Sequence, residues 1–98
     1  MQIIVVGCGK VGRSIISQLT QEDNNVTVID TNPTIIRNIS TNYDVMGIVG
    51  NGSSFNILAK ADLAHADMLI AVTESDEVNL LTCVIAKLNN HQCHTIAR

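Results

Sequence analysis

Residues 1–12, MQIIVVGCGKVG, decide the fold. The run Gln2–Val6 is rich in β-branched residues and predicts a strand that is buried on both faces. Gly7, Gly9 and Gly12 then form the pattern G-x-G-x-x-G directly before a segment of helical periodicity. In a dinucleotide-binding turn, these glycines allow a tight turn, a close approach of the backbone to a pyrophosphate, and close helix packing. The stretch therefore predicts a strand, a phosphate-binding turn and a helix.

A carboxylate follows the glycine motif at the sequence separation that is typical of dinucleotide-binding domains. The apolar run Val26–Ile29 ends at Asp30, about 20 residues after Gly12, where a ribose-binding acid is expected. Asp30 would accept hydrogen bonds from both hydroxyls of an adenosine ribose and would repel a 2′-phosphate. The prediction is therefore NAD(H) rather than NADP(H), the alternative being a surface aspartate that ends a strand. Lys10 and Arg13 could neutralise a diphosphate, could reach a third phosphate if the ligand is ATP, or could be solvated charges.

Strand-like and helical segments alternate along the chain, which predicts an α/β fold with a parallel sheet. The fold class is a Rossmann-like doubly wound sheet in three αβα layers, with strand order 3-2-1-4-5. Because the chain ends on the fifth strand, residues 1–98 are expected to be one nucleotide-binding domain cut from a longer chain. The expected strands are 2–6, 26–29, 45–49, 68–72 and 95–98, and the expected helices follow Gly9, Asn32, Ser54 and Val72.

Four loops would meet at the carboxyl ends of these strands, which is where open α/β sheets bind ligands. They are Gly7–Gly12, Asp30–Asn32, Gly50–Ser53 and Thr73–Ser75. All four are rich in glycine, short polar residues or carboxylates, whereas the loops at the opposite edge are ordinary. This asymmetry predicts one shared site.

Composition excludes several classes of function. The chain has a formal net charge of −3 with scattered basic residues and 2% aromatic residues, which argues against a nucleic-acid partner. No apolar run approaches the length of a membrane span, and Met1 leads directly into a strand, without room for a signal peptide. Cys8, Cys83 and Cys93 are widely spaced and odd in number, as expected in a reducing cytosol.

Two polar clusters have an ordinary explanation and a more specific one. Glu74, Asp76 and Glu77 would complement the amide dipole of a helix that Thr73 or Ser75 caps; the alternative is a cation site beside the nucleotide. Residues His91, Cys93 and His94 resemble a zinc cluster but alternate faces on a strand and lack a suitably spaced fourth ligand. No metal ligand is therefore predicted.

The last helix carries a broad apolar stripe. Part of this stripe must cover the sheet, and its width leaves room for a dimer surface. The stripe consists of Val78, Leu81, Val84, Ile85 and Leu88.

No catalytic residue is predicted. The single tyrosine, Tyr43, has no lysine four residues later, so the Tyr-x-x-x-Lys pair of short-chain dehydrogenases is absent. Neither a Cys–His nor a Ser–His pair stands where a nicotinamide would be expected. The chain is thus expected not to be an enzyme by itself.

With these loops placed, the chain resembles the N-terminal Rossmann domain of the RCK/KTN (TrkA-N) family of potassium-transport regulators. The resemblance rests on IIVVGCGKVG, Asp30, the segments Ile48–Ser54 (IVGNGSS) and Ala66–Leu81 (ADMLIAVTESDEVNLL), and Thr95–Arg98 (TIAR). These features cover nearly the whole chain, and the AVT-x-x-D-E-x-N-L pattern with G-N-G-S is far more particular than the glycine motif.

The resemblance implies a cytoplasmic domain that binds NAD(H), or alternatively ATP or ADP. It implies assembly as dimers or a ring at the inner face of the plasma membrane, on a potassium-transport subunit of the TrkH/TrkG type. Adenine would lie by the Asn51–Ser53 segment, Thr73 near the diphosphate or second ribose, and Arg98 toward the ligand or a dimer contact. Together with the loops, the expected nucleotide contacts are Gly7, Cys8, Gly9, Lys10, Val11, Gly12, Asp30, Thr31, Asn51, Gly52, Ser53, Thr73, Glu74 and Arg98.

Two other functions stay open at this point. The chain could be the nucleotide domain of an NAD-dependent dehydrogenase whose substrate domain is missing. It could also be the same RCK domain attached to a cation channel or antiporter.

Overall fold

The computed structural model describes residues 1–98 as five strands, four α-helices and one short 3-10 helix. The strands are β1 (Gln2–Val6), β2 (Asn25–Asp30), β3 (Met46–Val49), β4 (Met68–Ala71) and β5 (His94–Ala97). The helices are α1 (Lys10–Thr20), α2 (Pro33–Asn42), α3 (Phe55–Lys60), η1 (Leu63–His65) and α4 (Asp76–Asn89).

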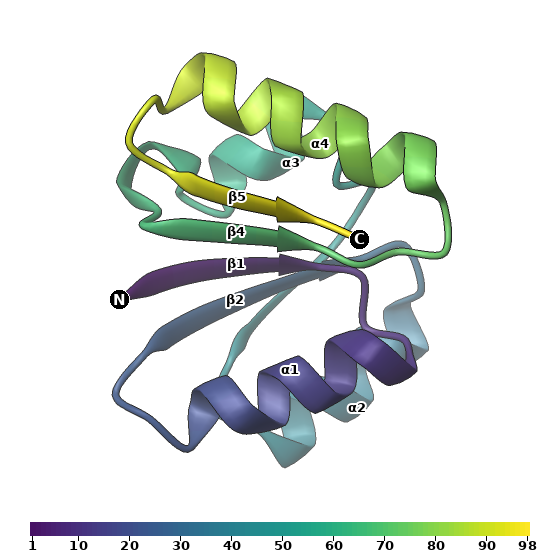
Figure 1. Ribbon diagram of the computed structural model, residues 1–98. Coiled ribbons are helices and arrows are strands. Elements are labelled where there is room, and N and C mark those ends of the chain that lie inside the picture. The colour runs from purple at the N-terminus through teal and green to yellow at the C-terminus, as the bar shows by residue number, and fades with distance from the viewer.

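All the strands run parallel in one sheet of order β3-β2-β1-β4-β5, as predicted. The central strand β1 pairs with β2 (Ile3↔Val26) and with β4 (Ile3↔Met68), so the direction of strand addition reverses beside β1. Helices α1 and α2 cover one face of the sheet and α3 and α4 cover the other (Figure 1). The sequence-based prediction of a doubly wound α/β fold in three layers is confirmed.

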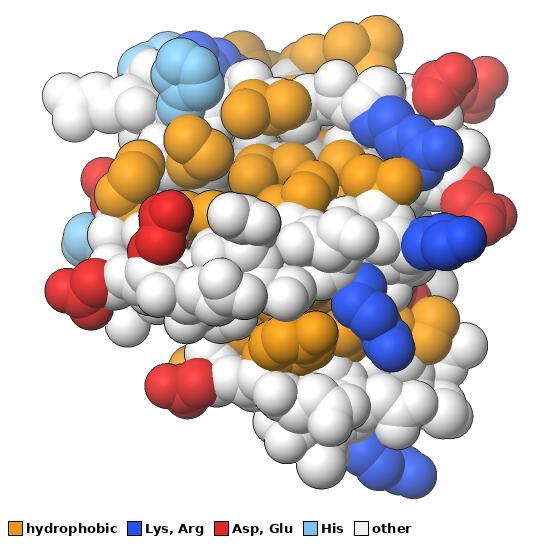
Figure 2. Space-filling view, turned by 60° about the horizontal axis from the view of Figure 1, so that its bottom comes forward, with side chains coloured by type: hydrophobic (Ala, Val, Ile, Leu, Met, Phe, Trp, Pro, Cys, Tyr) orange, Lys and Arg blue, Asp and Glu red, His pale blue; other side chains and the backbone are white.

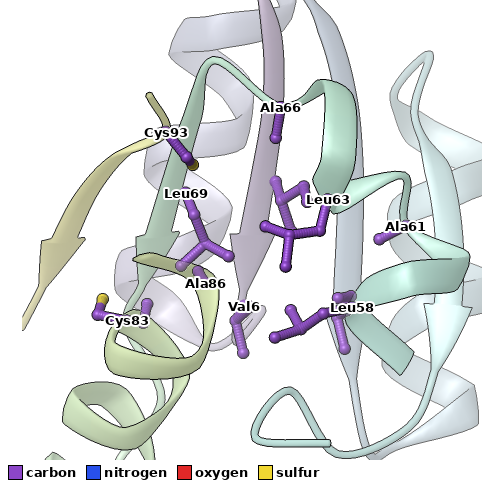
Figure 3. Packing of buried hydrophobic residues seen from close by; sticks show 12 residues of the cluster. Val6, Leu58, Ala61, Leu63, Ala66, Leu69, Cys83, Ala86 and Cys93 are labelled. Carbon is purple, nitrogen blue, oxygen red and sulfur yellow. The ribbon is translucent and has the colours of Figure 1, made fainter. Parts of the chain in front are cut away.

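The two faces of β1 belong to two separate apolar cores. Ile3 and Val5 pack with residues of α1 and α2, whereas Ile4 and Val6 pack toward α3 and α4. Figure 3 shows the second core, in which Leu58 lies close to Val6 and Leu63. A strand whose successive side chains enter opposite cores needs apolar residues throughout, which explains the unbroken run at the start of the chain.

Local capping determines where two of the helices begin. Asn32 caps α2, its Oδ1 accepting from the Thr34 N–H at 2.9 Å, and Pro33 occupies the first turn, where its missing N–H is not needed. Ser75 caps α4, its Oγ accepting from the Val78 N–H at 3.2 Å. Of the two predicted caps, Thr73 and Ser75, it is therefore Ser75 that begins the helix, and residues 73 and 74 belong to the preceding loop.

The apolar stripe of α4 covers the sheet only in part, as predicted. Ile85 is half-buried against the core, whereas Leu81, Val84 and Leu88 are exposed, the last to 70%. Most of the face that packs on the sheet is formed by residues outside the stripe, among them Cys83 and Ala86, which Figure 3 shows beside neighbouring core residues. These small residues let the helix lie close to the sheet and leave the three exposed side chains of the stripe outside.

Two shorter helices show the same kind of difference. The spacing of apolar residues predicts that α3 packs through Phe55, Leu58 and Ala59, but only Leu58 is buried. For α1 the spacing predicts a face of Val11, Ile15, Ile16 and Leu19. Ile16 is buried, whereas Val11 is 42% exposed because it lies at the helix start, beside the carboxyl ends of the strands. Figure 2 shows further hydrophobic side chains at the surface, as a band across the upper half of the molecule.

Candidate functional site

A pocket of about 740 Å³ opens at the carboxyl ends of β1, β2, β3 and β4. Its size falls in the range of small-molecule and cofactor sites. The four loops predicted to meet there all contribute to it. The lining residues are Val6, Gly7, Cys8, Gly9, Lys10, Val11, Ile29, Asp30, Thr31, Asn32, Ile35, Gly50, Asn51, Gly52, Val72, Thr73, Glu74, Ser75, Val78 and Arg98.

The glycine turn after β1 is a tight junction that tolerates no side chain at two positions. Gly7 has φ +100°, and a Cβ there would meet the Thr73 backbone N at 2.8 Å. A Cβ on Gly12 would collide with the Gly7 carbonyl oxygen, so the helix crosses directly over the turn. A Cβ on Gly9 would meet nothing within 4 Å. The turn is thus packed underneath and open on the side of the pocket.

The N-terminus of α1 points into this opening without a side-chain cap. Gly9 is the N-cap residue, and its carbonyl accepts the Arg13 N–H at 2.9 Å, but it has no side chain to satisfy the first amides. The first turn contains no acidic residue. The first-turn N–H groups have no acceptor within the helix, so the positive end of its dipole is available to an anion.

Asp30, at the end of β2, is held in place by two backbone amides. Its Oδ2 accepts the Cys8 N–H at 2.9 Å, and its Oδ1 accepts the Asn32 N–H at 2.9 Å. Each carboxylate oxygen accepts more than one hydrogen bond. Asp30 therefore joins the glycine turn to the next loop and retains acceptor capacity on both oxygens toward the pocket.

The thiol of Cys8 is buried beneath the turn. Burial, together with a smaller effect of the Asp30 carboxylate, raises its pKa to about 12, while Arg13 opposes the change. At neutral pH the sulfur is therefore a protonated, poorly nucleophilic thiol. Cys8 takes part in the site through its backbone N–H rather than through its sulfur.

The structure brings most of the sequence-predicted site residues to the pocket, but Gly12 and Ser53 do not line it. Gly12 lies behind the turn. The N–H and Oγ of Ser53 donate to Asn51 Oδ1 at 2.9 and 2.8 Å, so Ser53 shapes the loop that carries Asn51. Arg13 also lies outside the pocket, in a separate shallow groove that Tyr43 lines, whereas Lys10 borders both the pocket and this groove.

Two lining residues, Ile35 and Val78, were not predicted. They stand in the first turns of the helices that Asn32 and Ser75, the last residues of two predicted loops, cap beside the pocket. The available signal was their position just after the predicted loops. An apolar side chain in such a first turn reaches the carboxyl edge of the sheet and forms the pocket wall.

The two other polar clusters do not assemble into a metal centre. Cys93 is fully buried while His91 and His94 are exposed, and no three potential ligands come together anywhere in the chain. Asp76 and Glu77 lie in the first turn of α4, as expected for residues that complement a helix dipole.

On the face of the molecule drawn in Figure 2, most of the Lys and Arg side chains gather on the side toward which the strands point. None of the helices has the length and apolar character needed to cross a lipid bilayer.

Fold, topology and the glycine turn define a Rossmann-like α/β domain with a pocket at the topological switch point. The TrkA-N domain family matches residues 3–98, and the chain belongs to that family. Two Trk system potassium uptake proteins TrkA are 42% identical to it, one from Azorhizobium caulinodans over 85 residues and one from Halomonas elongata over 86 residues. These matches cover 87% and 88% of the chain but 19% of each relative, so the chain spans about a fifth of the length of these curated relatives.

Solved structures show the same fold. The TrkA-N domain of the inner membrane protein ybaL from Escherichia coli superposes with a TM-score of 0.92 at 26% identity, over 99% of this chain and 71% of that one. A Kef C-terminal domain from Shewanella denitrificans in an AMP-bound form superposes with a TM-score of 0.85 at 17% identity, over 97% of this chain and 57% of that one. The GsuK channel bound to NAD superposes with a TM-score of 0.80 at 18% identity, over 96% of this chain and 17% of that one.

Proposed function

We propose that this chain binds an adenine nucleotide in the pocket at the carboxyl edge of its sheet, with NAD(H) as the preferred ligand. The observation that carries this proposal is Asp30, whose two oxygens are each fixed by one backbone amide and remain able to accept ribose hydroxyls. A carboxylate at this position selects a free 2′,3′-diol and repels a 2′-phosphate.

The diphosphate would occupy the opening above the glycine turn. Gly7 and Gly9 shape this opening, the N-terminus of α1 supplies unpaired amides, and Lys10 adds a positive charge beside it. Val11 and Cys8 would contribute backbone contacts in the same turn. Gly12 would act indirectly, by letting α1 approach the turn.

The remaining contacts follow from the other loops. Asn51 and Gly52 would border the adenine, with Ser53 holding the Asn51 side chain. Thr31 would lie beside the ribose that Asp30 binds. Thr73, Glu74 and Arg98 line the opposite wall and would face the diphosphate or the second ribose.

ATP or ADP is the alternative ligand of the same site. An AMP-bound and an NAD-bound protein both share this fold, and the two ligands have the adenosine monophosphate group in common. Lys10 and Arg98 both line the pocket and could meet additional phosphates. The adenosine end of the site therefore has the stronger support.

The nucleotide is proposed to regulate rather than to react. Relatives named Trk system potassium uptake protein TrkA support a role in controlling a membrane potassium-transport subunit of the TrkH/TrkG type. In this role the domain would be cytoplasmic, would lie at the inner face of the plasma membrane, and would belong to a homo-oligomer of a longer protein. A bound nucleotide can shift the transporter only by its difference in affinity for two states of the assembly.

A thermal-shift panel with NADH, NAD⁺, NADPH, ATP, ADP and AMP tests the proposal. A ligand at about 100 times its Kd adds roughly 2.7 kcal/mol to the free energy of unfolding. Asp30→Asn should weaken NADH binding about 10- to 100-fold, as expected for hydrogen bonds to a charged group. A preference for ATP that survives Asp30→Asn would assign the site to a nucleoside triphosphate.

Asp67→Asn is the matched control for this panel. Asp67 is an exposed aspartate at the opposite edge of the sheet, and its Oδ2 also accepts a backbone amide, the Gln2 N–H at 2.7 Å. Its substitution should leave nucleotide binding unchanged. Equal losses in both variants, or no thermal shift of the wild-type protein with any nucleotide, would contradict the proposed function.

A further inference from the structure

Asn79, on the inner face of α4, is one of two polar residues that are fully buried in the protein. The other is Thr82, one turn further along the same helix, whose hydroxyl has no hydrogen-bond partner. Burying an amide is unfavourable unless its donor and acceptor are both used. The bonds that Asn79 makes therefore indicate why a polar residue stands at this position.

The side chain of Asn79 makes all three of its hydrogen bonds to a single residue, Thr73. Its Oδ1 accepts the Thr73 N–H at 2.9 Å and the Thr73 hydroxyl at 2.6 Å. Its Nδ2 donates to the Thr73 carbonyl at 3.0 Å. The side chain thus fixes the peptide groups on both sides of Thr73 as well as its hydroxyl.

No other side chain satisfies this pattern from the same position. It requires an acceptor and a donor on the two branches of one short planar group. Aspartate lacks the donor, leucine lacks both, and glutamine would place the amide one methylene too far from α4.

Thr73 is the point at which the pocket wall touches the glycine turn. It lines the pocket, and its backbone N lies where a Cβ on Gly7 would come within 2.8 Å. A shift of Thr73 would therefore open or block the turn that is proposed to receive the diphosphate. The hydroxyl donates to Asn79 and accepts the Ser75 N–H at 3.2 Å, so Thr73 serves as a fixed wall more than as a ligand donor.

We infer that Asn79 is a positioning residue of the nucleotide site, which it reaches only through Thr73. This inference rests on the proposed function. From inside the protein, Asn79 holds the loop between β4 and α4 against the glycine turn before any ligand arrives. The ligand then binds to an ordered wall and does not have to order the loop itself.

The test compares Asn79→Leu with Thr82→Val in the 98-residue protein. Both changes remove a fully buried polar group from the same helix face, but only the first removes bonds to the pocket. The Thr73 groups released by Asn79→Leu border the pocket and can be hydrated, so the domain should still fold. The measurements are the NADH dissociation constant and, without nucleotide, the hydrogen-exchange rate of the Thr73 amide.

For Asn79→Leu we expect the dissociation constant to rise at least tenfold and the Thr73 amide to exchange at least tenfold faster. Thr82→Val should match the wild type in both measurements. If circular dichroism shows Asn79→Leu to be unfolded, Asn79→Ala replaces it. This variant removes the same three bonds without adding volume, and it should show changes in the same direction.

Two results would overturn the inference while leaving the proposed function intact. One is wild-type affinity in a folded Asn79 variant. The other is an equal loss of affinity in Thr82→Val, which would mean that general packing of α4 sets the affinity. If the wild-type protein binds none of NADH, NAD⁺ and ATP, the proposed function itself fails, and the positioning role fails with it.

Discussion

The two edges of the sheet use the same kinds of polar residue in opposite ways. At the amino edge, Asn90 donates to the carbonyls of Leu63 and Ala66 at 2.9 and 3.0 Å, and Asp67 accepts the Gln2 N–H. These groups tie loops to each other. At the carboxyl edge, Asp30 also ties two loops but keeps acceptor capacity toward an open pocket.

Free acceptor capacity thus distinguishes residues that only maintain the fold from residues that can also bind a ligand. At the amino edge, removing a polar side chain should cost stability and nothing else. At the carboxyl edge, Gly7, Gly9 and Asp30 border the pocket while Gly12 lies behind the turn, so substitutions there should affect stability and ligand affinity separately. Four predictions sharpen this division, ordered from the largest expected effect to the smallest.

Gly12→Ala should cause the largest loss of stability. The new Cβ would collide with the Gly7 carbonyl, and the helix must move away from the turn. Overpacking of this kind costs about 3 kcal/mol of unfolding free energy, measurable by urea denaturation. Gly9→Ala is the matched change, because its Cβ meets nothing within 4 Å. It should change stability by less than about 0.5 kcal/mol but should weaken nucleotide binding, since the methyl group enters the opening. Equal loss of stability in the two variants would contradict this account of the turn.

Asn90→Ala should destabilise the protein by about 2 kcal/mol, because two partly buried carbonyls lose their donor. Its nucleotide affinity should equal that of the wild type when both proteins are fully folded. Asn89→Ala is the control, since Asn89 is exposed and bonds only to the Ile85 carbonyl of its own helix. A change in nucleotide affinity on Asn90→Ala would break the division between the two edges.

Alkaline pH should reveal the buried thiol beneath the glycine turn. In the folded protein the pKa of Cys8 is about 12, whereas the ordinary value is 9.0. Between these values the unfolded chain loses the proton and the folded protein keeps it. The stabilisation is therefore complete below pH 9 and is lost as the pH rises toward 12, by up to about 1.4 kcal/mol per pH unit.

Urea denaturation at several pH values above 9 measures this slope. Cys8→Ala should lower it, and the contribution of Cys83 and Cys93, whose pKa values burial also raises, should remain. Identical slopes for the variant and the wild type would show that the Cys8 thiol is not isolated from solvent.

Thr82→Val should have the smallest effect, and its sign should be opposite. The buried hydroxyl of Thr82 has no partner, and valine has nearly the same shape. Removing an unsatisfied buried hydroxyl should stabilise the protein by about 1 kcal/mol. Thermal unfolding would then show a rise of several degrees in Tm. A lower Tm would indicate that the hydroxyl is hydrated or bonded in solution.

The strands could be predicted to within one residue, and their order with them, because apolar runs are followed by recognisable turn residues. Gly7 and Asp30 end β1 and β2, and the unbroken apolar run of β1 identifies the central strand. The face of α4 could not be predicted from hydropathy. It packs on the sheet through Cys83, Ala86 and two polar residues, so the larger apolar side chains mark the wrong side.

For the candidate site, the sequence located the loops but not the direction of each side chain. Asp30 and Lys10 border the pocket as expected, whereas Ser53 turns back to Asn51 and Arg13 lies in a separate groove. The role of Asn79 depends on three contacts across a loop, and no local pattern reports such contacts. Which residues touch a nucleotide stays a prediction.

The central place of β1 also bears on how the chain matures during synthesis. β1 can pair early with β2, which follows it after one helix, but its other neighbour is β4, in the register Ile3↔Met68. Until about residue 72 has left the ribosome, β1 lacks its second neighbour and has an open edge. A nascent chain paused before β4 is therefore the form most exposed to aggregation and the one that most needs a chaperone.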